Sequence, residues 1–573
     1  MQKPLFLLYA SVIACLVLST ACSSEESYRT ASAGYDDYDS GSWTDSSEDT
    51  DSAAPDAQNA GNTDADESGS SSDCFEVDCP AGFYCEFGVC IPDGSSATTP
   101  VAALASDRYL YSLEVEKRRI VRIDAQEFQV DALETGLAPM DMQVMPGGER
   151  LMLADASDTV EIITGAGLYE ARVIWDTARS LSHVKIAPGG DHVVVYYDWD
   201  DPRALDRQPN PGNINQVSIL AVGTNDAMGD DDDHLVDLSV GLLPRDVQFS
   251  ADGAKAVIIG RREVTTVNLL SFEEGVAVPT HTIDIDESAI EFLVNDAASE
   301  ILLRYDGQPQ LDVVDLISGE VTCLQTEGTI LDITETGNDQ FLVAFTNDEG
   351  NHMSQLSFTD AAESCEAQAG TYAIGNARTL AYDPESNRTL AYVADEAVEN
   401  LWFIDLVTDE QQTIRLEKAV SAVAFSDSGT IVRIAHLKAD GTPAWNPTVE
   451  DTDVSIDKSY GVSWIDLTTG LQRLTIRDEP FGPFSFAPAL LGRVGATYQA
   501  LSEDSQPRLL VVEHSAGFNE SWIDLASETE HMGYILSTDS IYAIQDHPMG
   551  RVTFVNAESQ ELRHVTGYAL DLE

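Results

Sequence analysis

Met142-Gln143-Val144-Met145-Pro146-Gly147-Gly148 is an apolar strand that ends in a tight glycine turn. Related phrases return at residues 184–190 (VKIAPGG), 247–253 (VQFSADG) and 423–429 (VAFSDSG). Such phrases recur about every 45 residues from residue 101 onwards, and self-similarity at this period is typical of repeat architectures. The chain is therefore expected to fold as an array of similar units.

A second phrase places an aspartate at the end of a strand, before a turn that contains glycine, threonine or serine. It occurs at residues 121–124 (VRID), 313–319 (VVDLISG), 403–408 (FIDLVT) and 464–470 (WIDLTTG). Aspartate and glycine favour a tight hairpin into the next strand. Each unit thus contains four strands, the last at an edge, which is the pattern of one antiparallel blade of a β-propeller.

The number of blades is harder to predict than their type. About ten candidate units can be counted in residues 101–573, although insertions at 199–215, 225–234 and 439–458 obscure the boundaries. Because propellers typically close with four to eight blades, we expect an all-β propeller of seven or eight four-stranded blades, with some units being half-blades. We also expect the strands near residues 107–124 and 553–568 to share one blade and so close the ring.

These motifs resemble those of the YVTN, lactonase-like and WD-repeat-like group of β-propellers. Members share a Ser-Pro-Asp-Gly turn, which appears here as residues 250–253 (SADG) and 426–429 (SDSG), and an Ile-Asp-x-x-Thr-Gly hairpin. The proline is displaced or missing in these copies. The resemblance implies a propeller fold, but the motif is structural and belongs to propellers of many functions.

The chain is strongly acidic throughout. Its 573 residues include 98 Asp and Glu against 31 Lys and Arg, a formal net charge of −67, and 43% are hydrophobic. A surface this negative repels nucleic acid, which we therefore exclude as a partner. It suits cations or basic partners, and it is equally compatible with a solvated surface adapted to high ionic strength.

The N-terminus is predicted to be an export signal. Residues 1–21 contain a basic Lys3, an apolar stretch and a small residue before Cys22. The segment resembles a bacterial lipoprotein signal, which implies acylation of Cys22 and a lipid anchor in the cell envelope, at the outer membrane. Ser19 stands where the lipobox usually has leucine, and Cys15 fits the box by letter but leaves a short apolar region. A freely secreted protein or a retained membrane helix are the alternatives.

Two segments are expected to separate the anchor from the propeller. Residues 22–73 are rich in Ser, Asp, Glu and Ala and cannot bury enough apolar surface to fold, so we predict a disordered acidic tether. Residues 74–92 resemble a short EGF-like module. Export favours two disulfides over a zinc site, and the pairing among three possibilities stays open. The cysteines concerned are Cys74, Cys79, Cys85 and Cys90.

Two further cysteines lie within the repeats, about one period apart. Cys323 and Cys365 each follow the inner strands of successive units. We predict a disulfide between neighbouring blades, which would constrain the unfolded chain. Two buried free thiols are the alternative.

Two acidic insertions are the candidate binding loops, together with the insertion around Trp445. The first carries Trp199 among acids that suit a cationic or sugar ligand, and the second could hold Ca²⁺ through oxygen ligands. Exposed solvated loops are the alternative for both. We expect the three insertions to build one binding face. The residues of the two acidic insertions are Asp198, Trp199, Asp200 and Asp201, and Asp230, Asp231, Asp232, Asp233 and His234.

No hydrolase elbow, zinc helix, phosphate loop or EF-hand signature occurs in the sequence. We therefore predict no catalytic residues and no required cofactor. The favoured function is non-enzymatic binding of a protein, peptide or glycan at the cell surface. A lactonase-like, metal-dependent hydrolase at the central channel and a structural role in an envelope assembly are the alternatives.

Overall fold

The computed structural model describes residues 83–86, 89–92 and most of residues 102–568. The gaps are residues 107, 115–116, 136–138, 147–149, 156–158, 165–170, 179–180, 182, 199–213, 223–233, 272–279, 363, 427, 445–447, 449–450, 488–492, 499–505 and 515–516. The chain divides into two compact units, Met1–Gly94 and Ser95–Glu573.

The described part of the first unit is a β-hairpin. Strand β1 (Phe83–Glu86) pairs antiparallel with β2 (Val89–Pro92), and Cys85 lies opposite Cys90 in the register. Opposite residues of such a pair have Cα atoms about 5 Å apart, within the range that a disulfide spans. Cys22, Cys74 and Cys79 lie outside the described residues, so acylation and the pairing of the module stay predictions.

The second unit consists of antiparallel sheets of consecutive strands. Nine sheets have four strands, and the fifth along the chain has five. The first three are β3 (Ala102–Ala105), β4 (Tyr109–Glu114), β5 (Arg119–Asp124) and β6 (Val130–Glu134); β7 (Pro139–Val144), β8 (Arg150–Asp155), β9 (Thr159–Thr164) and β10 (Ala171–Asp176); and β11 (His183–Ile186), β12 (His192–Tyr196), β13 (Gln216–Ala221) and β14 (His234–Ser239).

The next three sheets include the one with an added strand. They are β15 (Asp246–Phe249), β16 (Lys255–Ile259), β17 (Glu263–Asn268) and β18 (Thr280–Asp284); β19 (Ala289–Val294), β20 (Glu300–Tyr305), β21 (Gln310–Asp315) and β22 (Val321–Thr326) with β26 (Ala367–Gln368); and β23 (Thr329–Gly337), β24 (Gln340–Asn347), β25 (Gly350–Ser357) and β27 (Tyr372–Ala373).

The remaining sheets complete the unit. They are β28 (Thr379–Asp383), β29 (Arg388–Tyr392), β30 (Asn400–Asp405) and β31 (Glu410–Arg415); β32 (Val420–Phe425), β33 (Ile431–His436), β34 (Tyr460–Asp466) and β35 (Leu471–Arg477); β36 (Phe481–Phe486), β37 (Arg493–Tyr498), β38 (Arg508–Glu513) and β39 (Asn519–Asp524); and β40 (Thr529–Ile535), β41 (Ser540–Gln545), β42 (Arg551–Asn556) and β43 (Leu562–Thr566).

Short helices occur only in connections of the described chain. They are η3 (Leu269–Ser271), η4 (Phe358–Asp360), η7 (Leu536–Thr538) and α2 (Thr452–Asp457). No helix in the described ranges has the length and hydrophobicity needed to cross a membrane.

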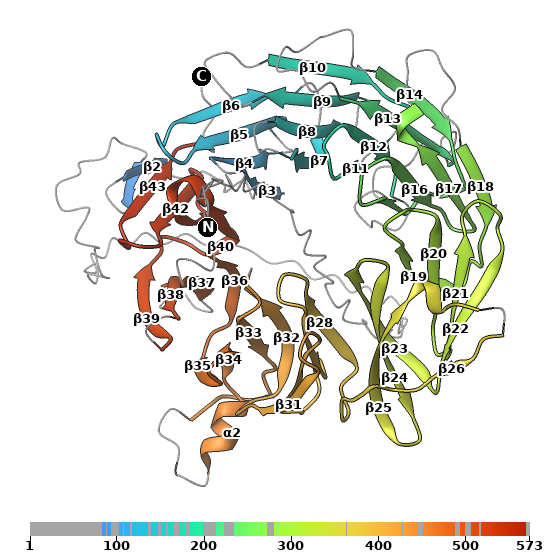
Figure 1. Cartoon of the computed structure of the whole chain (residues 1–573). Helices are drawn as coiled ribbons and strands as arrows, with labels where there is room; N and C mark the ends of the chain where they lie inside the picture. Colours follow the sequence, from blue (N-terminus) through green and yellow to red (C-terminus); the bar gives the residue numbers. More distant parts are fainter. Residues whose placement is uncertain are drawn as a thin grey trace, which may run out of the picture. The chain divides into compact units, whose positions relative to one another are not determined.

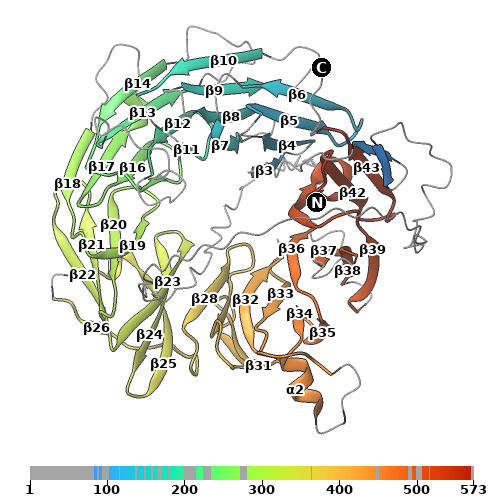
Figure 2. The same ribbon diagram turned by 180° about the vertical axis from the view of Figure 1, so that it is seen from behind.

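The sheets are the blades of a closed β-propeller. The first strands of the sheets surround the centre (Figure 1). Several consecutive ones contact one another, including β3 with β7, β7 with β11, and β40 with β3. Figure 2 shows the same ring from behind. Ten clusters of buried apolar side chains each join two consecutive blades, and one of them joins the last blade to the first.

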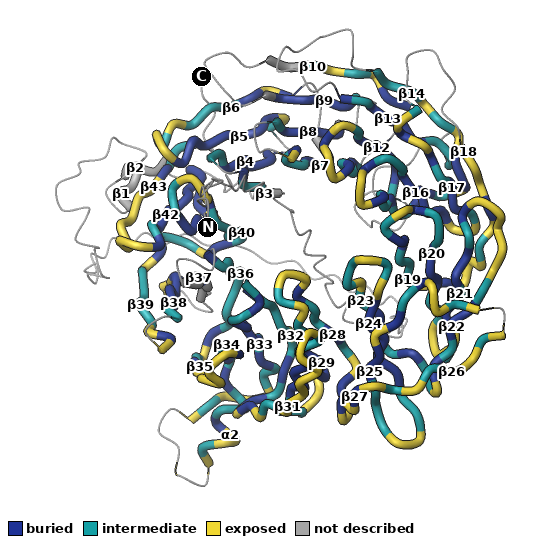
Figure 3. The backbone as a smooth tube through the Cα atoms, viewed as in Figure 1, coloured by how far each residue is buried: buried dark blue, intermediate teal, exposed yellow. Residues whose placement is uncertain are grey.

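The burial of each strand follows from its place in the blade. The middle strands are covered by a neighbouring blade on both faces, so they read as continuous apolar runs. Residues 193–196 of β12 are all buried, for example, whereas most of β31 is exposed at the outer edge. Figure 3 shows that the middle strands of the blades are mostly buried and that the outer strands are more exposed. The strands after the glycine turn were therefore the easiest to recognise in the sequence.

The expectation of seven or eight blades is wrong, because nine four-stranded blades and one five-stranded blade are present. The wedge angle between neighbouring blades sets their number, and side-chain packing over the whole interface decides that angle. The count of about ten repeats in the sequence was the better guide. The usual size range of propellers was misleading here.

The ring does not close by sharing a blade, contrary to prediction. The first and last blades are separate sheets. They meet through a cluster that includes Leu110 and Phe554. A hydrogen bond from Arg119 Nη2 to the Tyr568 carbonyl (2.6 Å) also joins them, and Arg119 is paired with the buried carboxylate of Glu114 (2.5 Å). The closure seam is therefore non-covalent.

The aspartate hairpins connect the third and fourth strands, as predicted. Asp315 Oδ1 accepts hydrogen bonds from the backbone N–H groups of Ile317 (2.9 Å) and Ser318 (2.6 Å). Gly319 then takes a left-handed conformation with φ of +72°. These backbone hydrogen bonds oppose the effect of burial and lower the pKa of Asp315. The carboxylate is therefore a structural group that shapes the turn.

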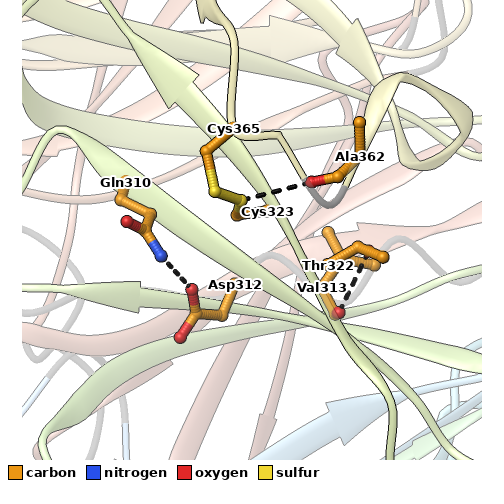
Figure 4. The surroundings of a disulfide bond; sticks show 7 residues. All are labelled: Gln310, Asp312, Val313, Thr322, Cys323, Ala362 and Cys365. Carbon is orange, nitrogen blue, oxygen red and sulfur yellow. Dashed lines mark hydrogen bonds between the residues drawn. A yellow bond between two sulfur atoms is a disulfide. The ribbon is translucent and has the colours of Figure 1, made fainter.

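The predicted disulfide between Cys323 and Cys365 is present (Figure 4). Cys323 lies on β22, the fourth strand of the fifth blade, and Cys365 lies between β25 and β27 of the next blade. The same segment adds β26 in parallel to β22, and Cys323 exchanges backbone hydrogen bonds of 3.1 Å with Ala362. The bond therefore joins neighbouring blades at the outer edge, and not beside the inner strands as expected.

Candidate functional site

The two faces of the ring carry different connections. One face, called here the insertion face, carries the links from second to third strands and from each blade to the next. It includes the two long connections 197–215 and 437–459. The opposite face, called the hairpin face, carries the glycine turns and the aspartate hairpins, such as 316–320. Binding residues concentrate on loops held by a rigid scaffold, so the insertion face is the first candidate.

The predicted acidic loops belong to opposite faces. In the third blade, His192, Ala221 and His234 are register partners at the hairpin-face end of the sheet. Asp198 follows Tyr196 at the other end, on the insertion face. Five residues of strand separate the two ends by about 17 Å. The expectation that all three insertions build one face is therefore wrong for the Asp230–His234 insertion.

The structure describes only Asp198 and His234 among the predicted loop residues. Trp199, Asp200, Asp201, Asp230, Asp231, Asp232, Asp233 and Trp445 lie outside the described residues. Calcium binding and ligand recognition by these side chains thus stay predictions.

A buried lysine holds the insertion of the eighth blade against the ring. Lys418 precedes β32 and is 1% exposed, and its Nζ donates a hydrogen bond to the carbonyl of Asp457 at the end of α2 (2.6 Å). Burial lowers the pKa of Lys418 to about 8. Ser455 of α2 exchanges hydrogen bonds of 2.7–2.8 Å with the backbone of Ala444. The base of this insertion is therefore attached to the ring and to α2 by hydrogen bonds.

A buried Ser–His pair lies beneath this insertion. His436 Nδ1 is 2.9 Å from the carbonyl of Ala419, so it carries the proton and donates. Nε2 therefore accepts the hydroxyl proton of Ser463, at 2.6 Å. Burial lowers the pKa of His436 to about 4, which keeps the ring neutral. Taken alone, the geometry would suit a nucleophile and its base.

Other blades show that this pair is structural. Ser218 and Thr265, on the third strands of the third and fourth blades, accept the N–H groups of Ala178 and Gly241, both at 2.9 Å. Each of these N–H groups belongs to the segment that enters the blade, as does the carbonyl bound by His436. The Ser463–His436 pair is thus one version of a device that attaches the entering segment to the third strand.

Polar side chains of the inner strands are used to join blades. Asp141 Oδ2 accepts the N–H of Val184 (2.8 Å), and Asp332 Oδ2 accepts that of Leu380 (2.8 Å). The two pairs are separated by 43 and 48 residues, close to one sequence repeat. The hydrolase hypothesis requires carboxylates that bind a metal ion at the centre. The carboxylates of Asp141 and Asp332 instead accept hydrogen bonds from the neighbouring blade. Among the described residues, no three His, Cys, Asp or Glu side chains are grouped to hold a metal ion.

Two open hollows lie on the surface of the described part of the ring. One, of about 600 Å³, lies on the insertion face beside Val398 and Arg415. The other, of about 370 Å³, lies at the closure seam on the hairpin face. The seam cavity is lined by residues within 125–128 of the first blade and within 537–540 and 554–563 of the last blade. The seam cavity is the more enclosed of the two, and the motif search in the sequence did not find it.

Comparisons with known proteins add no function. No protein-family model matches the chain, and no curated protein matches its sequence. The solved structures that it resembles are distant. They include a eukaryotic initiation factor (11% identity, 74% of this chain and 96% of that chain, TM-score 0.44). They also include the dihydro-heme d1 dehydrogenase NirN in complex with DHE (12%, 66% and 75%, 0.34) and the Myceliophteria thermophila Cps50 (Swd1) β-propeller domain (10%, 46% and 98%, 0.24). The propeller assignment thus depends on the sheet topology described above.

Proposed function

We propose that this protein is a non-enzymatic binding scaffold of the cell envelope, and that its insertion face holds a macromolecular partner, either a protein, a peptide or a glycan. The observation that carries this proposal is the placement of the two long connections. Residues 197–215 leave the third blade and residues 437–459 leave the eighth. These blades are five places apart in either direction around the ring.

The size of the ring supports a large partner. Packed sheets lie about 10 Å apart, so ten blade interfaces make a circumference of about 100 Å at mid-blade and a diameter of roughly 30 Å. A ligand in contact with both of the blades that these connections leave must span that diameter. Small-molecule sites are much smaller, with volumes of about 300–1,000 Å³. A partner that uses both connections is therefore a macromolecule.

The proposed lipid anchor would hold the ring by the same face. Strand β3 begins and β43 ends at the insertion face, because Ala102 lies opposite Leu113 and Thr566 opposite Arg551. A flexible chain of the length of residues 22–73 has an end-to-end distance of about 40 Å, and acidic repulsion extends it further. Such a tether would leave room for a partner between the ring and the membrane.

Separate replacement of the two long loops of the third blade tests which face binds the partner. In one variant a Gly-Ser linker replaces residues 199–213, and in the matched control it replaces residues 223–233 on the hairpin face. We expect the first replacement to abolish co-purification of the partner from detergent-solubilised envelopes and the second to preserve it. Loss of the partner only in the second variant would show that the wrong face has been chosen.

The anchor requires a separate test. Cys22→Ala should abolish labelling with a radioactive fatty acid and release the protein from the membrane fraction. Cys15→Ala, the matched control, should leave both unchanged. Membrane retention of the Cys22→Ala variant would contradict lipidation at this position, without bearing on the binding face.

A cofactor plays no part in the proposed binding function. Ca²⁺ at Asp230–Asp233 is a separate proposal that would add order to the hairpin face. Metal analysis of the protein purified without chelator checks it, since one Ca²⁺ per chain that disappears when residues 223–233 are replaced is the expected result.

A further inference from the structure

The cavity at the closure seam is built from both ends of the propeller. The β5–β6 hairpin of the first blade forms one wall, and the β42–β43 hairpin with η7 of the last blade forms the other. Its volume of about 370 Å³ is that of an ordinary small-molecule site. It lies on the opposite face from the two long connections, so a ligand here is independent of the partner proposed above.

A strained aromatic residue forms part of the wall. Phe128 has φ of +56°, in the left-handed region that is costly for bulky residues. It occupies the fifth position of an aspartate hairpin, which is left-handed in other blades too: glycine fills it at Gly319 and Gly470, and polar residues fill it at Asp409 and Gln560. Phe128 is the aromatic member of this set. Strain of this kind concentrates at functional sites, where the surrounding structure maintains it.

Phe128 belongs to an aromatic and charged group at the cavity. Its ring meets that of Phe554 edge to face, with centroids 5.5 Å apart. The guanidinium of Arg563 lies 5.0 Å from the centroid of Phe128, and it is paired with Glu561 (3.1 Å). The pair presents a donor and an acceptor side by side with no net charge.

Uncommitted polar groups complete the lining. The side chains of Asn556 and Ser540 hydrogen-bond within the last blade, the former by donating to the Thr538 carbonyl at 3.1 Å. In contrast, the buried hydroxyl of Thr538 has no partner. The side chains of Gln126 and Ser537 also make no hydrogen bond within the described chain, and both residues are exposed at the cavity.

We propose that this seam cavity binds a neutral saccharide unit. A sugar ring has an apolar C–H face that suits the half-buried ring of Phe128, which packs on the buried Phe554. The sugar hydroxyls suit the Gln126 and Ser537 side chains and the Glu561–Arg563 pair. An anionic ligand is disfavoured, because Glu561 already neutralises the only cation of the lining and the chain carries a net charge of −67. A bound sugar touches both blades of the seam and therefore stabilises ring closure.

Saturation-transfer NMR with the full chain tests the proposal. The probes are glucose, galactose, mannose, N-acetylglucosamine, cellobiose and lactose, each up to about 50 mM, since a single-pocket sugar contact corresponds to millimolar affinity. We expect at least one sugar to bind and to raise the melting temperature. Absence of binding by every probe would overturn the proposal.

Variants decide whether the cavity is responsible. Phe128→Leu keeps an apolar side chain but loses the flat ring, and Ser537→Ala loses a hydroxyl, so each should weaken binding by roughly three- to tenfold. The matched control is Val407→Ala, on the aspartate hairpin of the seventh blade, where Val407 is 72% exposed. Equal binding by all three variants, with melting temperatures showing that each is folded, would place the sugar elsewhere and overturn the assignment.

Discussion

Removal of the Cys323–Cys365 disulfide should destabilise the propeller measurably. The bridge closes a loop over a sequence separation of 42 residues, and the chain-entropy relation gives about 4 kcal/mol for a loop of that length at 25 °C. This loop contains three strands of the sixth blade, β23, β24 and β25. Without the bridge, β26 is held to β22 by a short parallel ladder and the hydrogen bonds at Ala362.

The assay is urea unfolding of the full chain, followed by tryptophan fluorescence. The double variant Cys323→Ser/Cys365→Ser avoids a reductant, which would also act on the N-terminal cysteines. For a unit this large the dependence on urea exceeds about 3 kcal/mol per molar, so the midpoint should fall by roughly 1 M. Hydrogen exchange should also show faster exchange at Ala367 and Gln368.

Two controls separate the bridge from its surroundings. Cys365→Ser alone should match the double variant, because either change removes the bond. Gln310→Ala alters an exposed side chain beside the bridge (Figure 4) and should leave the midpoint unchanged. A double variant with the midpoint of the unmodified protein would refute the loop-entropy reasoning.

Three further outcomes follow from the packing of the ring. Folding keeps His436 neutral with a pKa of about 4, whereas the unfolded chain gains a proton below about pH 6.5. The contribution of His436 to stability should therefore fall by about 2 kcal/mol from pH 7 to 5, and His436→Asn should remove that part of the loss in calorimetric scans. Gly375→Ala should lower the free energy of unfolding, measured in urea, by more than about 3 kcal/mol. The reason is that φ at this position is +62° and a Cβ atom would collide with Trp402. Arg119→Leu removes a seam hydrogen bond and leaves a buried carboxylate unpaired. It should lower the free energy of unfolding by about 3–5 kcal/mol, whereas the exposed Arg378→Leu should lower it by under about 1 kcal/mol. Thermal unfolding of the two variants checks this difference.

Much of the blade could be predicted from local sequence. The turn at Ser250–Gly253 forms as expected, with the Gly253 N–H donating to the Ser250 carbonyl at 2.8 Å and φ of +69° at Gly253. The aspartate hairpins were also predicted correctly, because turn geometry depends on residues a few positions apart. The Cys323–Cys365 disulfide was predicted from the repeat length, which places the two cysteines in neighbouring blades.

Other features needed distant residues to be placed together. Lys418, His436 and Ser463 look like unrelated polar residues in the sequence, and only the fold of the eighth blade brings them into one buried group. Phe128 stands where two hairpins have glycine and two others have Asp409 and Gln560, all with positive φ. The sequence could not show its role, because its partners are more than 400 residues away in the last blade.

The sequence alone determined the unit of this protein: four strands, a glycine turn and an aspartate hairpin, repeated at a constant period, since backbone hydrogen bonding and turn chemistry act over a few residues. Tertiary structure decided how many units close the ring, which face each insertion leaves and where a cavity forms at the seam. These properties depend on the wedge angle between packed blades, and that angle is a sum over side chains from strands far apart in the chain.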